Sequence, residues 1–356
     1  MVNGARLAAL AGGCALLALL SGCATAPKAA TKAYTFFPPA PDEPRVQFLT
    51  AFSSDVDFGW RNSFADFITG KPAAPNQLVK PYGLASESGR ILVCDTVRGT
   101  VQVFDLRKRR SQYFTPRGEG RLQMPINIAI DEDGTRYVAD TGRNQVGIFN
   151  KDNTYLGAIG IKDEMKPCDV AITADRLYVA DLKSHAVRVY DKAQRKFLFA
   201  IPRDPNAAEG KLFSPVNLAV NPKGRLLVSD IGGFVVQAYD LEGKFLQTIG
   251  KQGVGAGAFA RPKGVAVDRT GLTYVVDAAT QVVQIFDPDG RLLMYFGQPG
   301  ASTKGELSLP AGVDIDYENV GYFQKYLAPG RQCEYLILVT SQFGPHKVNV
   351  YGFLKK

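Results

Sequence analysis

Short apolar stretches separated by turns rich in Asp, Asn and Gly recur along most of the chain. Val, Ile, Leu, Phe and Tyr dominate the stretches, which occur in groups of four. Residues of this kind between such turns predict four-stranded antiparallel sheets. One group has its stretches at residues 218–220, 226–228, 235–239 and 245–249, with turns at 221–224, 230–233 and 240–243.

The group of four stretches repeats six times, and each copy has a proline at the start of its first stretch. The prolines are Pro81, Pro125, Pro167, Pro215, Pro262 and Pro310, spaced 42 to 48 residues apart. One copy is too small to bury its apolar surface alone, so the copies must stack around a common axis. The sequence therefore predicts an all-β fold, a six-bladed β-propeller.

The sixth copy ends at the C-terminal apolar stretch 348–352 and lacks a fourth strand. A suitable strand, residues 46–52, precedes the first copy. Pairing of these two segments would close the ring and remove two exposed sheet edges. We therefore expect a folded domain over residues 45–356, closed by its N-terminal strand.

The fifth copy closely resembles the NHL repeat. It contains Gly250, Gly253 and Phe259, then Arg-Pro-Lys-Gly-Val-Ala-Val-Asp at 261–268 and Tyr-Val-Val-Asp at 274–277. The resemblance implies a six-bladed NHL propeller. NHL propellers serve as protein-binding modules, RNA-binding modules and a few enzymes, so the resemblance implies a platform and does not fix an activity.

The N-terminus has the features of a bacterial lipoprotein signal. Arg6 precedes the apolar run 7–20, which has signal-peptide length and is too short to span a membrane. The run ends in Leu20-Ser21-Gly22-Cys23, which resembles a lipobox. The resemblance implies a signal peptide over residues 1–22 and lipidation of Cys23. The alternative is an ordinary secretory signal with an incidental cysteine.

Residues 23–44 are rich in Ala and Pro and predict a semi-extended tether behind the lipidated cysteine. A diacylglycerol with a further acyl chain anchors a protein stably without spanning. Ala24 follows the cysteine, and by resemblance to enteric sorting a residue other than Asp there favours the outer membrane. We therefore expect a lipid-anchored protein of the bacterial cell envelope, at the outer membrane.

Charge and cysteine usage exclude several classes of function. The net charge is +8, but the basic residues are dispersed and form no basic face with interleaved aromatics, which argues against nucleic-acid binding. After signal removal and lipidation, Cys94, Cys168 and Cys333 remain, so at least one is unpaired. No Cys-x-x-Cys occurs, which excludes c-type haem attachment.

Repeated polar residues mark turns. Identical aspartates follow the second strand of five copies and are expected to accept backbone N–H groups as Asx turns. His185 and His346, the only histidines, are expected in turns too, and two histidines cannot supply the three-histidine zinc site of a related amidating lyase. The aspartates are Asp95, Asp140, Asp181, Asp230 and Asp277.

The position two residues after each repeat proline is the best candidate site. It holds Gly83, Asn127, Asp169, Asn217, Gly264 and Gly312, at the start of the innermost strand. Gluconolactonase-like propellers, similar in fold, hold calcium with such oxygens at the mouth of the channel. The alternative is that these residue types only permit left-handed backbone in a turn. Asp314, whose counterparts are all alanine, would need a partner, water or a cation there.

Two segments depart from the repeat. Within residues 53–80, Phe64, Phe67 and Ile68 fall at helical spacing near Trp60 and predict a helical lid docked over or beside the channel mouth. The alternative is a solvated loop. Residues 317–333 interrupt the sixth copy, and strand order places the two segments on opposite faces.

The sequence favours a non-catalytic binding or scaffold lipoprotein that presents a propeller face to other envelope proteins. The alternative is a gluconolactonase-like enzyme or small-ligand receptor with a cation, calcium, at Asn127, Asp169, Asn217 and Asp314.

Overall fold

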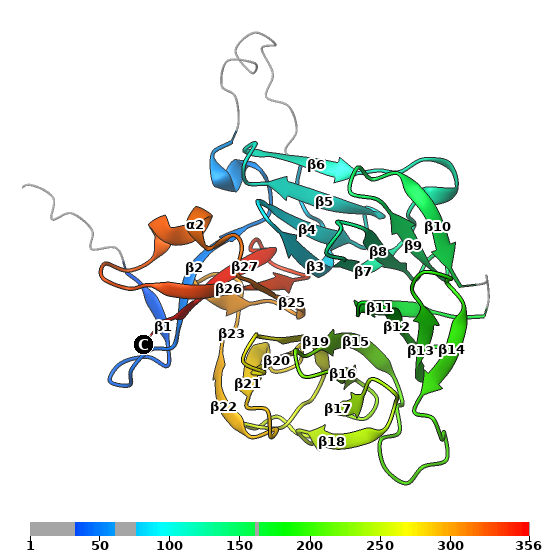
Figure 1. Ribbon diagram of the computed structural model, residues 1–356. Helices are drawn as coiled ribbons and strands as arrows, with labels where there is room; N and C mark the ends of the chain where they lie inside the picture. Colours follow the sequence, from blue (N-terminus) through cyan, green and yellow to red (C-terminus); the bar gives the residue numbers. More distant parts are fainter. Residues whose placement is uncertain (1–32, 61–75, 161–163, 356) are drawn as a thin grey trace, which may run out of the picture. The chain divides into compact units, whose positions relative to one another are not determined.

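A computed structural model describes residues 33–60, 76–160 and 164–355. Its folded unit, Tyr34–Lys356, consists of six antiparallel sheets arranged as blades around a central axis (Figure 1). The prediction of an all-β, six-bladed propeller is confirmed. The first strand of every blade lies innermost and begins at its repeat proline.

The first three blades each contain four strands in sequence order from the axis outward. Blade one contains β3 (Pro81–Glu87), β4 (Arg90–Asp95), β5 (Thr100–Asp105) and β6 (Arg110–Phe114). Blade two contains β7 (Pro125–Ile130), β8 (Arg136–Asp140), β9 (Gln145–Phe149) and β10 (Tyr155–Ile159). Blade three contains β11 (Pro167–Ile172), β12 (Arg176–Asp181), β13 (Ala186–Asp191) and β14 (Phe197–Ile201).

Blades four and five follow the same order, and blade six combines both ends of the unit. Blade four contains β15 (Pro215–Val220), β16 (Arg225–Asp230), β17 (Val235–Asp240) and β18 (Phe245–Ile249). Blade five contains β19 (Pro262–Val267), β20 (Thr273–Asp277), β21 (Val282–Phe286) and β22 (Leu292–Phe296). Blade six contains β25 (Pro310–Asp316), β26 (Cys333–Ser341), β27 (Val348–Leu354), β2 (Val46–Phe52) and β1 (Thr35–Phe37).

The connections contain only short elements. They are η1 (Val56–Phe58), η2 (Gly118–Gly120), α2 (Val320–Phe323), η3 (Gln324–Tyr326) and the small parallel pair β23 (Gln298–Pro299) and β24 (Glu306–Leu307).

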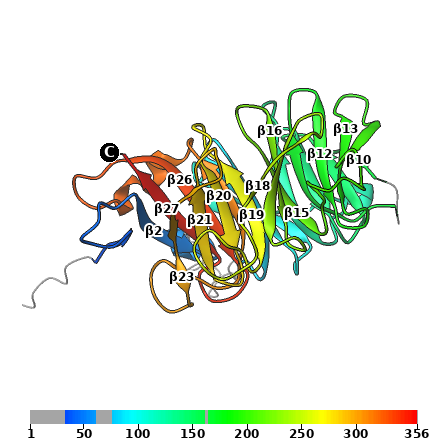
Figure 2. The ribbon, with the colours of Figure 1, turned by 90° about the horizontal axis from the view of Figure 1, so that it is seen from below.

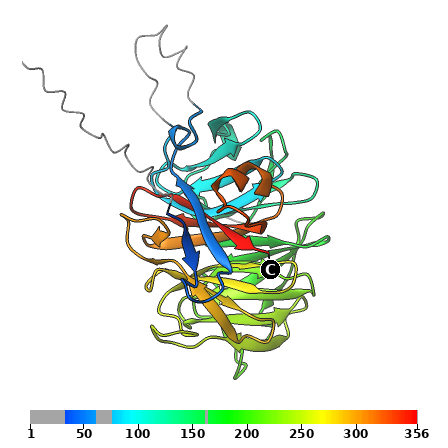
Figure 3. The same cartoon turned by 90° about the vertical axis from the view of Figure 1, so that its left-hand side faces the viewer.

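The N-terminal strand closes the ring, as predicted. β2 pairs antiparallel with β27, from Val46 opposite Phe353 to Phe52 opposite Val348, and Figure 3 shows the two strands side by side. β1 then adds a fifth strand outside β2, which was not expected. We expected the folded domain to start near Arg45, but the unit begins at Tyr34 because Phe37 packs on Phe296 and Tyr351.

The core lies between neighbouring blades. Between blades three and four, for example, Tyr178 and Val189 pack with Leu226, Val228 and Tyr239, all fully buried. Every blade thus shares its apolar surfaces with its two neighbours, which is why a single copy could not fold alone.

The propeller has two faces, which are visible from the side in Figure 2. We define the entry face as the face formed by two sets of loops: the connections that lead into the inner strands, and the turns between second and third strands. The exit face consists of the turns between first and second strands and between third and fourth strands.

The two irregular segments meet, whereas strand order had placed them on opposite faces. The ring of Phe58, just after β2, lies 6.4 Å from the ring of Phe323 on α2. Phe58 also stacks on Trp60 at 4.1 Å, and both pack on the core between blades six and one. Because a blade twists from its inner to its outer strand, the end of β2 reaches sideways to blade one. The predicted lid residues Phe64, Phe67 and Ile68 lie outside the described residues.

Candidate functional site

The repeated aspartates are structural, as expected. Each is almost completely buried and accepts several backbone N–H groups. Asp230, for example, accepts N–H groups of Phe213 at 2.8 Å, Ser214 at 2.7 Å and Gly232 at 3.1 Å. The carboxylate therefore fastens the connection from the preceding blade to the turn of its own blade, a role beyond the predicted Asx turn. Asp95, Asp140, Asp181 and Asp277 accept N–H groups of the equivalent connections.

The candidate column lies on the inner strands, and the proposed left-handed turn is wrong. None of its six residues has a positive φ angle. Its glycines instead reflect crowding, because a Cβ on Gly312 would lie 2.5 Å from the carbonyl oxygen of Tyr82, and one on Gly264 would lie 2.7 Å from that of Ala311. Neighbouring inner strands approach too closely for side chains there.

Asp169 and Asn217 connect blades three and four inside the channel. Asp169 Oδ1 accepts the N–H of Val170 at 2.7 Å, and Oδ2 accepts the N–H of Leu218 at 2.8 Å and Nδ2 of Asn217 at 3.3 Å. Burial raises the pKa of Asp169 to about 7 in spite of these three donors. Asn217 Oδ1 is buried and has no partner among the described residues.

The other two candidate residues have local partners. Asn127 Oδ1 accepts the N–H of Ile128 at 3.0 Å. Asp314 Oδ2 accepts the hydroxyl of Ser86 at 2.7 Å, so the carboxylate is paired across the junction of blades six and one. Burial raises the pKa of Asp314 to about 6.

All four candidate residues line one cavity of about 300 Å³ along the axis, to which every inner strand contributes. Only Asp169 and Asn217 are hydrogen-bonded to each other. Calcium prefers six to eight oxygen ligands, whereas here most of the oxygens already accept N–H or O–H groups. In the described part of the chain, no three His, Cys, Asp or Glu side chains gather as a metal site. The residues therefore fit a resident calcium ion poorly.

Two residues that the sequence analysis missed lie at the start of the inner strands. Tyr82 and Lys263 each follow a repeat proline, and Lys263 Nζ lies 4.9 Å from the centre of the Tyr82 ring. Asp169 and Cys168 of blade three are close enough to Tyr82 to raise the pKa of its phenol, after burial as the main cause. Tyr82 thus lies near residues of blades three and five. The signal was a lysine in a column otherwise held by Tyr82, Ile126, Cys168, Val216 and Ala311.

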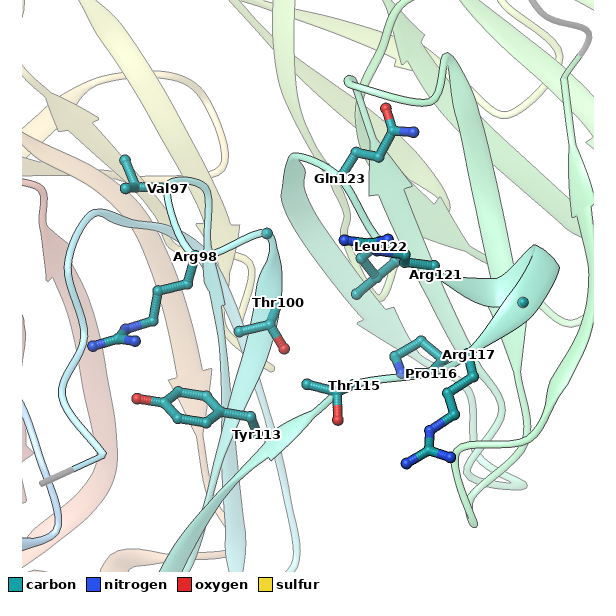
Figure 4. Close-up of a pocket in the computed structure, with 12 residues that line it drawn as sticks. Val97, Arg98, Thr100, Tyr113, Thr115, Pro116, Arg117, Arg121, Leu122 and Gln123 are labelled. Atoms are coloured by element: carbon teal, nitrogen blue, oxygen red, sulfur yellow. The ribbon is translucent and has the colours of Figure 1, made fainter. Parts of the chain in front are cut away.

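A second, larger hollow of about 1050 Å³ lies between blades one and two, beside the entry face. We call it the arginine groove. Figure 4 shows Arg98 and Tyr113 on one side and Arg117 and Arg121 on the other. Arg98 lies over the Tyr113 ring at 5.2 Å and donates to the carbonyl oxygen of Gln77. The twelve lining residues include three arginines and no carboxylate.

The histidines and cysteines behave as turn and core residues. His185 has a φ of 52° and contacts the carbonyl oxygen of Phe213, and His346 lies in the turn between β26 and β27. Cys94, Cys168 and Cys333 are all buried and free. Burial raises the pKa of the Cys168 and Cys333 thiols to about 12.

Comparison with known proteins supports the fold. A gluconolactonase from Xanthomonas campestris superposes with a TM-score of 0.56 at 16% identity, covering 79% of this chain and 88% of that chain. A streptogramin B lyase gives a TM-score of 0.52 at 12% identity, with 78% and 94% covered. The virginiamycin B lyase of Staphylococcus aureus with quinupristin gives 0.52 at 11% identity, with 78% and 96% covered.

No protein-family model matches the chain, and no curated protein matches it in sequence. At these identities the structural neighbours share the propeller architecture, and their activities do not transfer with it. The resemblance to NHL repeats remains a prediction from the sequence.

Proposed function

We propose that this protein is a lipid-anchored, extracytoplasmic binding propeller whose entry face docks other proteins of the cell envelope. One observation carries the proposal: large apolar side chains are exposed on one face. Of the fourteen in the described residues, strand order assigns seven to the turns and connections of the entry face, six to outer strands and Tyr322 to an exit-face connection, although the segments of Val56 and Tyr322 meet beside blades six and one. The seven are Val56, Val79, Val97, Met124, Phe213, Val254 and Phe343.

Charge on the same face indicates an acidic partner. The turns between second and third strands contain four charged side chains, and all four are basic: Arg98, Arg143, Lys183 and Lys347. In blades one to three the aspartate before the turn is buried and accepts backbone N–H groups, and Asp95 also lies 3.9 Å from Arg98 Nε. The turns thus present basic charge, whereas the connections of the same face also contain exposed acidic residues such as Glu119, Asp204 and Glu209. Exposed apolar side chains among charged residues are typical of protein interfaces.

The arginine groove is the most defined docking position on this face. Guanidinium groups bind carboxylates in a planar, bidentate geometry. Neither Arg117 nor Arg121 donates a side-chain hydrogen bond to another described residue, so both are available to a carboxylate-bearing segment of the partner. Val97 and Leu122 add apolar surface to the groove.

Anchoring rests on the sequence. The lipobox-like ending at Cys23, with Ala24 after it, supports lipid attachment at the outer membrane. Residues 23–33 would then link the lipid to the folded unit. In the described residues, no helix is long and apolar enough to cross a membrane.

Site-specific photocrosslinking in intact cells tests the docking face. A photoreactive phenylalanine analogue replaces Phe213 or Phe343 on the entry face, Leu198 on an outer strand, or Tyr322 on the exit face. We expect a discrete adduct from the two entry-face positions and none from the others. Equal adducts from all four positions, or an adduct from Tyr322 alone, would contradict the proposal.

The second candidate function is a small-ligand receptor or gluconolactonase-like enzyme that uses the axial cavity. The unpartnered Asn217 Oδ1 favours it, because a buried carbonyl oxygen without a donor could be satisfied by a ligand. Thermal shift assays with sugar lactones on wild type and Asn217→Leu separate the candidates. A saturable stabilisation of the wild type alone would support the receptor.

A further inference from the structure

A buried cation occupies the start of the channel at the entry face. Lys263 is only 5% exposed, yet its ammonium donates no hydrogen bond to any described residue. Its one close polar or aromatic contact is the face of the Tyr82 ring. The nitrogen is not among the fully buried polar atoms without a partner, so it keeps contact with solvent, and a small acceptor could reach it there.

Two basic groups near Lys263 further disfavour its positive charge. Arg261 and Lys80 lie near enough to disfavour its charged form, and with burial they lower the pKa of Lys263 to about 8. Lys80 itself lies over the Phe343 ring at 5.7 Å. Two further basic groups, one before blade one and one before blade five, therefore lie within electrostatic range of Lys263.

No acidic residue of the inner rim compensates them. The positions directly before and after the six repeat prolines contain four basic residues and no carboxylate: Lys80, Lys166, Arg261 and Lys263. Asp95 and Asp277 lie close to Lys80 and Arg261, but their carboxylates accept the backbone N–H groups of those residues at 3.2 and 3.0 Å. Asp169 is already held by three N–H donors.

We propose that the entry-face mouth of the channel binds an oxyanion, a phosphate or a small carboxylate, with Lys263 as the central ligand and Lys80 and Arg261 beside it. An anion there supplies the acceptor that the Lys263 ammonium lacks and relieves the repulsion among the three cations. The site does not depend on the docking of a partner protein.

Thermal unfolding of the intact protein with inorganic phosphate or succinate tests the site, with sodium chloride at matched ionic strength as the reference. Ligands that bind only the folded state raise the melting temperature in a saturable way. We expect one or both anions to do so for the wild type and for Lys251→Met, which removes an exposed charge of the same connection. Lys263→Met should lose the anion-dependent rise whatever its own melting temperature.

The protonation of Lys263 gives a second readout. Carbon-13 NMR of the lysine Cε groups, with the Lys263 signal assigned by its loss in Lys263→Met, follows its titration. The pKa of Lys263 should rise when the effective anion is added, because the anion favours the charged form. An effect of phosphate alone, or of succinate alone, on the melting temperature and on the pKa of Lys263 identifies the ligand class. If neither anion raises the melting temperature in a saturable way, the proposal is overturned. An equal rise in the melting temperature of Lys263→Met also overturns it and indicates an adventitious ion only.

Discussion

Asn217 on β15 donates from Nδ2 to Oδ2 of Asp169 on β11 at 3.3 Å, so one side-chain contact ties blade four to blade three inside the channel. The backbone N–H of Leu218 donates to the same oxygen at 2.8 Å. A carboxylate held in this way joins two blades at the point where their inner strands come closest. It also leaves few lone pairs for a metal ion.

Calcium should therefore leave the melting temperature of the mature protein unchanged within a degree or so. The oxygens of Asn127 and Asp169 that would bind it already accept N–H groups. Differential scanning fluorimetry with calcium, and with EDTA as control, checks this. A calcium-dependent rise that is absent in Asp169→Asn would instead support the small-ligand receptor.

Asp169 should make the folded protein less stable as pH rises, whereas a carboxyl group with a lowered pKa has the opposite effect. Its pKa is raised from 3.8 to about 7 in the folded protein, so between about pH 4 and pH 7 the folded state binds more protons than the unfolded state. The free energy of unfolding therefore falls as pH rises through this window, by on the order of 4 kcal/mol at most.

Urea unfolding at pH 5 and pH 8 measures this effect by comparing wild type with Asp169→Asn. The wild type should lose more stability than the variant on going to pH 8. Asp287→Asn is a silent control, because hydrogen bonds from the backbone N–H and side chain of Arg291 lower the pKa of Asp287 below 3.8, so this carboxyl group does not titrate between pH 5 and pH 8. An identical pH dependence in wild type and Asp169→Asn would show that Asp169 is not buried as described.

Asp230→Ala should destabilise the propeller by about 3 kcal/mol. It leaves the N–H groups of Phe213, Ser214 and Gly232 without their acceptor in a buried position. Asp240→Ala is the matched control at an exit-face turn, where water can replace the carboxylate for the N–H groups of Glu242 and Lys244. Chemical denaturation compares the two, and equal losses would argue against the fastening role of the buried aspartates.

Stepwise N-terminal truncation should separate the contributions of β1 and β2 to the stability of the propeller. A protein that begins at Tyr34 should melt like the mature protein, and one that begins at Arg45 should lose the modest contribution of β1. A protein that begins at Ser53 lacks β2 and exposes β27 as an edge, so we expect aggregation or loss of cooperative unfolding. Unchanged melting after removal of β2 would contradict closure by this strand.

Lipidation at Cys23 predicts that labelled palmitate enters the wild type and not Cys23→Ala. The substituted protein should also leave the membrane fraction, because the predicted anchor is the lipid alone. Membrane fractionation of the same samples locates the wild type, which we expect at the outer membrane because Ala24, and not an aspartate, follows the cysteine. Equal labelling of both proteins would refute the lipoprotein interpretation.

The repeat in the sequence determines most of the fold. Six prolines in register, four apolar stretches per copy and one missing fourth strand were enough to predict six blades and the pairing of residues 46–52 with the C-terminal strand. Local patterns succeed here because each strand and turn is specified within its own copy. The start of the unit at Tyr34 was missed because β1 is short and irregular in pattern, and it is held by Phe37 on other strands.

The candidate site depended on relationships between blades. The sequence identified Asn127, Asp169, Asn217 and Asp314 as unusual, but it could not show that N–H groups already occupy most of their oxygens. It also gave no sign that Lys263 meets Tyr82, because these residues are 181 positions apart in the chain and belong to blades five and one.

The sequence alone determined the blades, their number, the closing strand and the turn aspartates, because those features follow from local hydrogen bonding and side-chain alternation within each copy. Only the tertiary structure decided which residues of different blades meet at the axis, that Phe58 meets Phe323, and which face exposes its apolar side chains. Those contacts depend on how twisted sheets stack around a ring, and no single copy of the repeat specifies that arrangement.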